Sequence, residues 1–292
     1  MINFPIKYQN GNYQVTIEAD GTKTRITPEE EFKAKRPETI DVNLSNYCEN
    51  NCSFCYISAS KGGKTADIKK DEFFKTIKPY TELAVNFYNK RRQFYEDLMF
   101  LAERNLIVNV TVHFDDFAKY KHYFLFLQKQ KLIYGLGVSI QKDFDLKKLN
   151  GFKELVVHTI AGLTKKEVFE KLKNKKVLVL GFKTKGKTEA KAIPELTQQK
   201  EIIKLAIEKK HFEVLTFDNL AIEQLSIKDM VSTKVWEEHY MGAEGSASFY
   251  YDAVSKKAYC SSLEKKEKGI EAEKKSSIEL FEVFKSGVLQ KL

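Results

Sequence analysis

Residues 39–58 read TIDVNLSNYCENNCSFCYIS, and this stretch joins two different kinds of sequence. Its first six residues are mostly β-branched or apolar, which predicts a short strand. Its second part holds three of the four cysteines of the chain, Cys48, Cys52 and Cys55, spaced C-x3-C-x2-C among several asparagines. A polar stretch of this kind indicates a loop. The sequence therefore predicts a strand that ends in a loop rich in thiols.

Short apolar runs and amphipathic stretches alternate from this strand to residue 217. The predicted strands cover residues 39–44, 82–87, 106–114, 134–140, 155–162, 177–182 and 212–217. The predicted helices cover residues 69–78, 91–105, 118–131, 165–174 and 199–210. Such alternation predicts the α/β class, with a parallel sheet covered by helices. Periodicity does not distinguish a doubly wound sheet from a complete or partial (β/α) barrel. In both architectures, ligands bind at the carboxyl ends of the strands.

Two segments flank the alternating region. Residues 1–36 contain the turn signals Asn10-Gly11 and Asp20-Gly21, followed by a charged connector, which predicts a small antiparallel β unit. Residues 240–292 predict a hairpin followed by a terminal helix. The expected organisation is an N-terminal β unit at 1–36, a (β/α) domain at 37–239 and a C-terminal extension at 240–292.

The composition is that of a globular protein able to bury a large core, with 292 residues and 42% apolar content. Lysines and arginines number 49 against 40 acidic residues, a formal charge of +9, and the lysines are spread in short runs. Spread lysines are typical of solvated faces, and a nucleic-acid groove is the less favoured interpretation. No export signal or stretch of ~20 apolar residues is present, so a cytoplasmic protein with reduced thiols is expected.

Three clustered thiols suit an iron–sulfur cluster better than zinc. A [4Fe–4S] cluster normally takes four thiolates, so three leave one iron open to an outside ligand such as S-adenosylmethionine. A structural zinc ion needs four protein ligands. The only further cysteine, Cys260, lies far along the chain within "KKAYCSS", where packing is the more common role.

The segment "CENNCSFCY" at 48–56 resembles the cysteine motif of the radical S-adenosylmethionine superfamily, including the aromatic Phe54 before the third cysteine. More distant resemblance, to radical S-adenosylmethionine proteins of bacteria and phages, extends over most of the chain. It lies in "KPYTELAVN", "LIYGLGVSI", "VVHTIAG", "VLGFK", "FDNLAIEQL" and "YMGAEG". The resemblance implies a partial TIM-type (β/α) barrel, a [4Fe–4S] cluster, S-adenosylmethionine and an electron donor such as flavodoxin or ferredoxin. It supplies no substrate.

The same resemblance implies positions for the nucleotide. Phe54 and Tyr56, around the third cysteine, are expected near the adenine. The Gly-Gly-Glu-like motif that holds the methionine amino group is absent, and Asn86 is the only stand-in at the end of its strand. Ser139 and Gln141, which follow one another on one strand face, are candidates for the ribose hydroxyls or the methionine carboxylate.

The later strand ends complete the expected cofactor site. "HTIAGLTK" keeps Ile160 and Gly162 of a motif that flanks the adenine but lacks its first glycine and its glutamate. His158 replaces that glycine and is either a core residue or a proton carrier, since the reference pKa of histidine lies near neutrality. Phe182 ends the next strand, followed by Lys183, for which a surface position is the default interpretation.

Polar residues at two further strand ends are candidates without a motif. Asp218 is interpreted as a site residue, and Asn219 as the N-cap of the following helix. Thr111, His113 and Asp115 alternate, which places them on one side of a strand, although a metal triad is not favoured. Glu244 lies between glycines and is a candidate lid residue. The catalytic candidates are His158 and Asp218.

Two other functions stay open at this stage. The departures from the family motifs favour a catalytically silent protein that binds a cluster and senses redox state. The excess of basic over acidic residues permits a zinc-containing nucleic-acid-binding protein. Within the enzyme class, peptide, nucleotide and small-metabolite substrates are equally compatible with the sequence.

Overall fold

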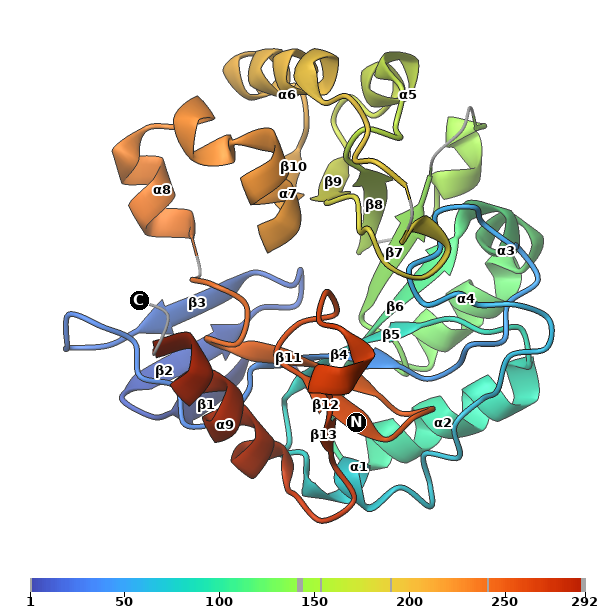
Figure 1. Ribbon diagram of the computed structural model, residues 1–292, viewed down its shortest axis with the longest axis vertical. Helices are drawn as coiled ribbons and strands as arrows, with labels where there is room; N and C mark the ends of the chain where they lie inside the picture. The colour runs from blue at the N-terminus through green and yellow to red at the C-terminus, as the bar shows by residue number, and fades with distance from the viewer. Residues whose placement is uncertain (1, 141–143, 153, 190, 241, 290–292) are drawn as a thin grey trace.

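The computed structural model describes residues 2–140, 144–152, 154–189, 191–240 and 242–289. Within these ranges the chain forms a three-stranded sheet and a ten-stranded sheet that is mostly parallel. Figure 1 shows the helices at the periphery and the strands of the larger sheet toward the centre. The predicted α/β class is confirmed.

Seven strands of the larger sheet run parallel and lie side by side in chain order. They are β4 (Thr39–Asn43), β5 (Glu82–Asn86), β6 (Ile107–His113), β7 (Gly135–Ser139), β8 (Leu155–Ile160), β9 (Lys176–Leu180) and β10 (Val214–Phe217). Each lies inside a run that the sequence predicts as a strand, except that β9 begins at Lys176, one residue before its predicted range. The seven predicted strands are therefore confirmed.

The C-terminal segment adds three more strands to the same sheet. β11 (Ser248–Asp252) pairs in parallel with β4, and β12 (Lys257–Tyr259) and β13 (Ile270–Glu271) continue the sheet antiparallel. The predicted hairpin is thus present as β11 and β12. Its parallel pairing with β4 was not expected from the sequence.

The two faces of the main sheet differ in polarity. On β6, Val108, Val110 and Val112 are at most 2% exposed, whereas the alternate Asn109 and Thr111 are half-buried on the other face. Helices cover the apolar face, which removes these valines from water. The polar face is left to line the interior of the curved sheet.

The helices follow the predicted alternation with a few differences. They are α1 (Glu72–Thr76), α2 (Arg91–Glu103), α3 (Phe114–Lys119), α4 (Lys121–Lys129), α5 (Lys166–Lys171), α6 (Thr197–Glu208), α7 (Asn219–Leu225), α8 (Thr233–His239) and α9 (Ser277–Leu289). Every predicted helix overlaps one of these elements, although α6 begins at Thr197, two residues before its predicted range, and α8 lies outside all the predictions. The predicted terminal helix is confirmed as α9, whose Leu280 and Phe281 are fully buried.

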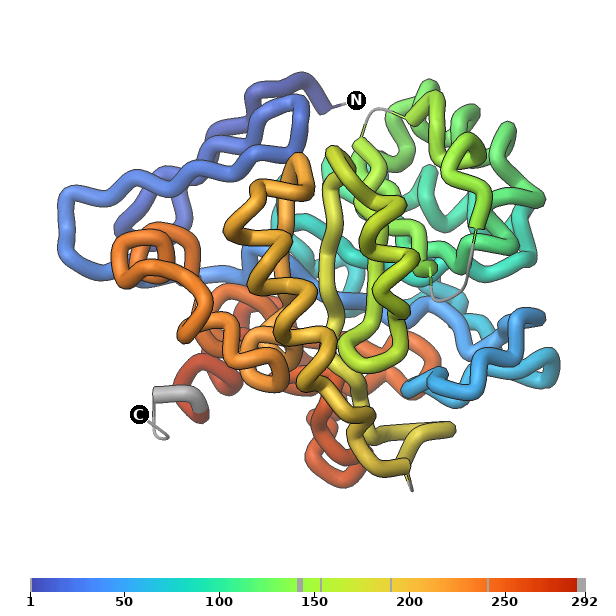
Figure 2. Tube along the Cα trace, turned by 90° about the horizontal axis from the view of Figure 1, so that it is seen from above, coloured from blue at the N-terminus to red at the C-terminus, as the bar shows by residue number. Residues whose placement is uncertain are grey.

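The N-terminal unit is a separate antiparallel sheet of β1 (Ile6–Asn10), β2 (Tyr13–Ile17) and β3 (Lys23–Ile26). In Figure 2 it projects at one end of the molecule, in dark blue. Glu38, just before β4, ties it to the main sheet: its carboxylate accepts hydrogen bonds from the Tyr13 hydroxyl at 2.5 Å and from Arg25 Nη2 at 2.6 Å. Glu38 is 1% exposed, so its carboxylate is buried at this connection.

The main sheet curls so that strands distant in its order share a pocket. Asp41 of β4, Phe217 at the end of β10 and Tyr250 of β11 line the same pocket of about 210 Å³. In the described ranges no hydrogen-bonded pairing joins β10 to β11, β12 or β13. None of the helices described there combines the length and apolar character needed to cross a bilayer.

Candidate functional site

The three clustered cysteines lie in a closed loop that follows β4. The two ends of this loop meet through hydrogen bonds from Asn46 N to Lys64 O at 2.8 Å and from Cys48 N to Ser60 O at 3.0 Å. Gly63 is required at this closure, because a Cβ there would lie 1.8 Å from Asn46 O. The loop is therefore held by its own backbone at the carboxyl end of the first parallel strand.

Asn86, at the end of β5, fixes the start of the cysteine loop. Its Oδ1 accepts the Leu44 N–H at 2.8 Å, and its Nδ2 donates to Ser45 O at 2.8 Å. The side chain thus continues the ladder between β4 and β5 beyond the last backbone pair. Asn86 acts here as a support for the loop, with both its amide groups engaged by the backbone.

The thiols of Cys48, Cys52 and Cys55 are half-buried and free of disulfides. Cys55 Sγ accepts the Ala59 N–H at 3.3 Å, and Cys48 Sγ accepts Asn50 Nδ2 at 3.7 Å. Burial, with the nearby sulfurs of the other two cysteines, raises the pKa of Cys52 to about 11. The three sulfurs are thus close enough to influence one another.

No three His, Cys, Asp or Glu side chains among the described residues converge tightly enough to hold a metal ion. A [4Fe–4S] cluster binds each thiolate at a different iron, so its ligands surround a volume and need not meet at one point. N–H groups directed at sulfur favour the thiolate form that such a cluster needs. The donor set therefore fits a cluster in kind and number, with three thiols from one loop.

A second segment, residues 183–189 together with Lys191, holds the cysteine loop from outside. Lys187 N donates to Cys55 O at 3.1 Å, and Lys191 Nζ donates to Ser53 O at 2.8 Å. Gly186 has φ +65°, and a Cβ on it would lie 2.3 Å from Tyr56 O. This contact has no local signal in the sequence, because the two segments lie far apart along the chain.

Lys183 links the cysteine loop to the pocket of about 210 Å³. Its Nζ lies 4.3 Å from the centroid of the Tyr56 ring and donates to Ser262 Oγ at 2.7 Å. Ser262 lines the pocket together with Glu244. Lys183 is half-buried, and burial opposes its charge, but Tyr56 and the carboxylates of Asp218, Asp41 and Glu244 outweigh this effect and raise its pKa. The surface position expected for Lys183 is wrong.

Asp41 is a pocket residue that sequence reasoning missed. Burial raises its pKa to about 6, with Glu244 and Asp218 adding to the rise and Lys183 opposing it. The Asp41 side chain is exposed to the pocket, and the protein atoms around the pocket still raise the pKa of its carboxyl group. The signal in the sequence was an acidic residue inside the apolar run TIDVN.

Asp218 and Asn219 exchange the roles expected from the sequence. Asp218 is the N-cap of α7: its Oδ1 accepts the N–H of Ala221 at 2.8 Å and that of Gly181 at 2.8 Å. Asn219 is the first residue of the helix and donates from Nδ2 to Gly242 O at 3.3 Å. Both side chains line the pocket, so the cap assignment to Asn219 is corrected and the pocket position of Asp218 is kept.

His158 lies on the inner face of β8, at the level of Ser139 on β7 and Leu178 on β9. Its ring fills the space above Gly137, where a Cβ would lie 2.2 Å from Cε1. Burial lowers the pKa of His158 to about 4, and its Nδ1 has no hydrogen-bond partner in the described part of the chain. The imidazole is thus neutral near pH 7. Gln141, the other candidate of this strand end, lies outside the described residues.

The remaining cofactor candidates have mixed environments. Phe54 is half-buried in the cysteine loop, and Ile160 lies on the same face of β8 as His158. Gly162 has φ +75° and donates its N–H to Gln199 Oε1. The backbone of Phe182 is held by Gln224, which accepts from its N–H at 2.8 Å and donates to its carbonyl at 2.9 Å.

Thr111 and His113 lie on β6 as predicted, but the strand ends before it reaches Asp115. Asp115 belongs to α3, and His113 caps this helix by accepting the Asp115 N–H at Nδ1, 3.2 Å away. The three residues therefore do not share a strand face. No metal triad forms from them in the part of the chain described here.

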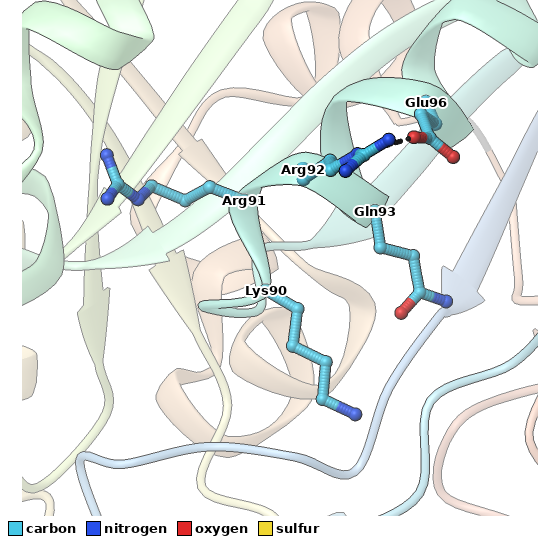
Figure 3. A pocket seen from close by; sticks show the side chains of 5 residues that line it. All are labelled: Lys90, Arg91, Arg92, Gln93 and Glu96. Carbon is cyan, nitrogen blue, oxygen red and sulfur yellow. Dashed lines mark hydrogen bonds and ion pairs between the residues drawn. The ribbon is translucent and has the colours of Figure 1, made fainter.

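A second hollow, of about 490 Å³, lies at the start of α2 and is strongly basic. Figure 3 shows Lys90 and Gln93 extending to one side, Arg91 to the other, and Arg92 bonded to Glu96. Lys90 Nζ lies 5.1 Å from the centroid of the Tyr47 ring, next to the cysteine loop. These residues come just after Phe87 and Tyr88, which stand near the positions where the resembled family has the glycines of its Gly-Gly-Glu-like motif. No protein-family model and no curated protein matches the chain.

Proposed function

We propose that the chain is a radical S-adenosylmethionine enzyme, with Cys48, Cys52 and Cys55 as the ligands of a [4Fe–4S] cluster. The observation that supports this most is the position of the three thiols. They lie together in one closed loop at the carboxyl end of the first of seven parallel strands. Ligands of parallel α/β proteins bind at that end of the sheet.

The architecture proposed with this function is a partial TIM-type barrel. Seven parallel strands in chain order, each followed by helical structure, supply the barrel wall from β4 to β10. The pocket shared by β4, β10 and β11 supports strong curvature of this wall. β11 would then cover the side that a partial barrel leaves open.

When bound, the cluster would supply one electron to S-adenosylmethionine, which gives methionine and a 5′-deoxyadenosyl radical able to remove hydrogen from a substrate. The residues of the chain have other tasks. Asn86 and Gly186 fix the cysteine loop from two sides. His158 stays a catalytic candidate in its neutral form, since burial lowers its pKa to about 4 and opposes proton uptake near pH 7.

The cofactor-binding positions proposed for S-adenosylmethionine surround this loop at the strand ends. They are Phe54, Tyr56, Asn86, Ser139, Gln141, Ile160, Gly162 and Phe182. Tyr56 has the best support, because it follows Cys55 directly and its ring centroid lies 4.3 Å from Lys183 Nζ. Asn86 has the least, because its amide is bonded to Leu44 and Ser45.

The reaction requires an electron donor such as flavodoxin or ferredoxin and a compartment in which thiols stay reduced. We therefore place the protein in the cytoplasm. The substrate class is treated separately below, from the pocket itself.

The test is anaerobic reconstitution with iron and sulfide, followed by an assay for 5′-deoxyadenosine after addition of S-adenosylmethionine and dithionite. The wild type is expected to form 5′-deoxyadenosine, and Cys52→Ala to form none. Ser53→Ala is the matched control, because Ser53 is an exposed neighbour in the same loop and its backbone contact is unchanged. A wild type that holds a cluster but forms no 5′-deoxyadenosine would contradict the proposal.

One observation favours a second function, a cluster-binding redox sensor without turnover. Phe87 and Tyr88 are buried where the resembled family has glycines, and Asn86 is bonded to backbone. This leaves no obvious group for the methionine amine on β5. A reversible redox signal that S-adenosylmethionine does not alter would support the sensor.

A further inference from the structure

The pocket of about 210 Å³ has room for about seven water molecules at ~30 Å³ each, or for a ligand group of similar size. It is built from distant parts of the chain: the middle of β4, the junction of β10 and α7, the loop before β11, β11 itself and the turn after β12. The lining residues used below are Asp41, Phe217, Asp218, Glu244, Tyr250 and Ser262.

The charges around the pocket are unequal. Three carboxylates, those of Asp41, Asp218 and Glu244, line it, and among the described residues the ammonium of Lys183 interacts with Asp41 and Glu244. Lys183 is directed to Ser262 Oγ and the Tyr56 ring, and it forms no ion pair within 4 Å in the described part of the chain. Negative charge in the pocket is therefore only partly balanced by the protein.

The Asp41 side chain is exposed to the pocket and has no hydrogen bond or ion pair among the described residues. Desolvation by the surrounding protein raises its pKa to about 6. Burial also raises the pKa of Glu244, and the Ser261 hydroxyl offsets this only in part. A positive ligand group would pair with Asp41 and favour the charged form of both carboxylates.

The type of cation follows from the other walls. Aromatic rings of Phe217 and Tyr250 line the pocket beside the carboxylates, and aromatic faces attract organic cations. A hard metal ion would instead need several oxygen ligands around one point, and no such group of three occurs among the described residues. The walls thus fit an alkyl stem with a charged nitrogen at its end.

We propose that this pocket binds an organic cation, a primary ammonium or guanidinium on an alkyl stem, with the charged nitrogen facing Asp41 and Glu244 and the stem against Phe217 and Tyr250. Through Lys183 and Tyr56 the pocket adjoins the cysteine loop. The inference that the pocket binds an organic cation does not depend on the enzyme function. The inference that such a cation is the substrate rests on the function proposed above.

The test measures binding to the purified chain without cluster, by titration calorimetry or ligand-observed NMR at pH 7.5. The probes are pentylamine, its uncharged analogue 1-pentanol and the anion pentanoate. Pentylamine is expected to bind about tenfold more tightly than 1-pentanol, because it adds a charged bond to the same stem. Pentanoate is expected to bind more weakly than either.

Asp41→Asn should weaken pentylamine binding by about tenfold and leave 1-pentanol unchanged. Glu208→Gln, an exposed carboxylate on α6, is the matched control and should change neither. In the wild type, affinity for pentylamine should fall as the pH is lowered from 7.5 to 5, because Asp41 becomes protonated near pH 6. The groups that face Asp41 are Lys183, Glu244 and Asp218, and the pH series in Asp41→Asn separates its titration from theirs.

Preference for pentanoate, displacement of pentylamine by millimolar Mg²⁺, or unchanged affinity in Asp41→Asn would each overturn the inference. The two proposals fail separately. Formation of 5′-deoxyadenosine by a protein that does not bind pentylamine would refute the pocket assignment alone. Pentylamine binding without 5′-deoxyadenosine formation would refute the enzyme assignment alone.

Discussion

The side chain of Asn86 extends the pairing of β5 to the backbone of Leu44, whose N–H it accepts at Oδ1 over 2.8 Å. The same amide donates to the next carbonyl, that of Ser45. One side chain thus decides how the cysteine loop leaves β4. The sequence interpretation had assigned this residue to cofactor binding.

Asn86→Ala should lower the free energy of unfolding by about 1–3 kcal/mol, because it leaves backbone groups of Leu44 and Ser45 without partners. Modification of the three loop cysteines by a thiol reagent should also become faster. Urea unfolding and the modification rate are the two measurements. Gln198→Ala removes an exposed amide elsewhere and should change neither. Unchanged thiol reactivity in Asn86→Ala would show that Asn86 does not hold the loop.

Gly186→Ala should destabilise the clamp on the cysteine loop, since the new Cβ would lie 2.3 Å from Tyr56 O at a left-handed φ. A loss of about 1–3 kcal/mol in the free energy of unfolding is expected. Iron incorporation on reconstitution should fall with it. Gly62→Ala is the control in the loop itself, because a Cβ there meets nothing within 4 Å. Equal behaviour of the two variants would argue against the clamp.

Glu38→Gln should lower the free energy of unfolding at pH 7 by about 3–5 kcal/mol, because it leaves Arg25 without its buried partner. Burial alone would raise the pKa of Glu38, but Arg25, Lys23 and Tyr13 outweigh it and hold the pKa below 4.5. The ionised Glu38 carboxylate therefore contributes its full stabilisation of the folded state above about pH 4.5. This stabilisation is lost as the pH falls through the lower pKa that Glu38 has in the folded state. Urea unfolding at pH 7 and pH 3 should show the two proteins converging in acid. A constant difference between them would contradict the assignment.

Gly137→Ala and His158→Ala should be coupled, because the Cβ of the first variant would lie 2.2 Å from Cε1 of the His158 ring. Gly137→Ala alone should cost about 1–3 kcal/mol from overpacking. In the double variant most of this cost should disappear, since the ring is gone. A double-mutant cycle on urea unfolding measures the coupling. If the two changes in unfolding free energy were strictly additive, the His158 ring would not lie against Gly137.

Lys183→Met should raise the pKa of Asp41 above its present value of about 6, because the ammonium is the one group that lowers it. Carbon-13 NMR of the labelled carboxylate over a pH series measures this directly. Lys185→Met is the control, since Lys185 does not contribute to the Asp41 pKa. A fall in the Asp41 pKa in Lys183→Met would contradict the charge arrangement inferred for the pocket.

The sequence was sufficient for the strands of the α/β region, because their apolar runs are short, continuous and separated by amphipathic stretches. It was insufficient where distant segments meet. The pairing of β11 with β4 and the contact of Gly186 with Tyr56 have no local signal. Asp218 and Asn219 are equally good caps by residue type, so only the geometry separates their roles. Lys183 looked like a surface residue because charge alone does not reveal enclosure.

The central claim is that three cysteines of one loop hold a [4Fe–4S] cluster whose open iron receives S-adenosylmethionine. Electron paramagnetic resonance of the anaerobically reconstituted, dithionite-reduced protein tests it most directly. The account predicts about four iron atoms and four sulfides per chain, with a reduced-cluster signal that changes when S-adenosylmethionine is added. A protein that incorporates no iron and sulfide, or a cluster signal that S-adenosylmethionine leaves unchanged, would contradict it.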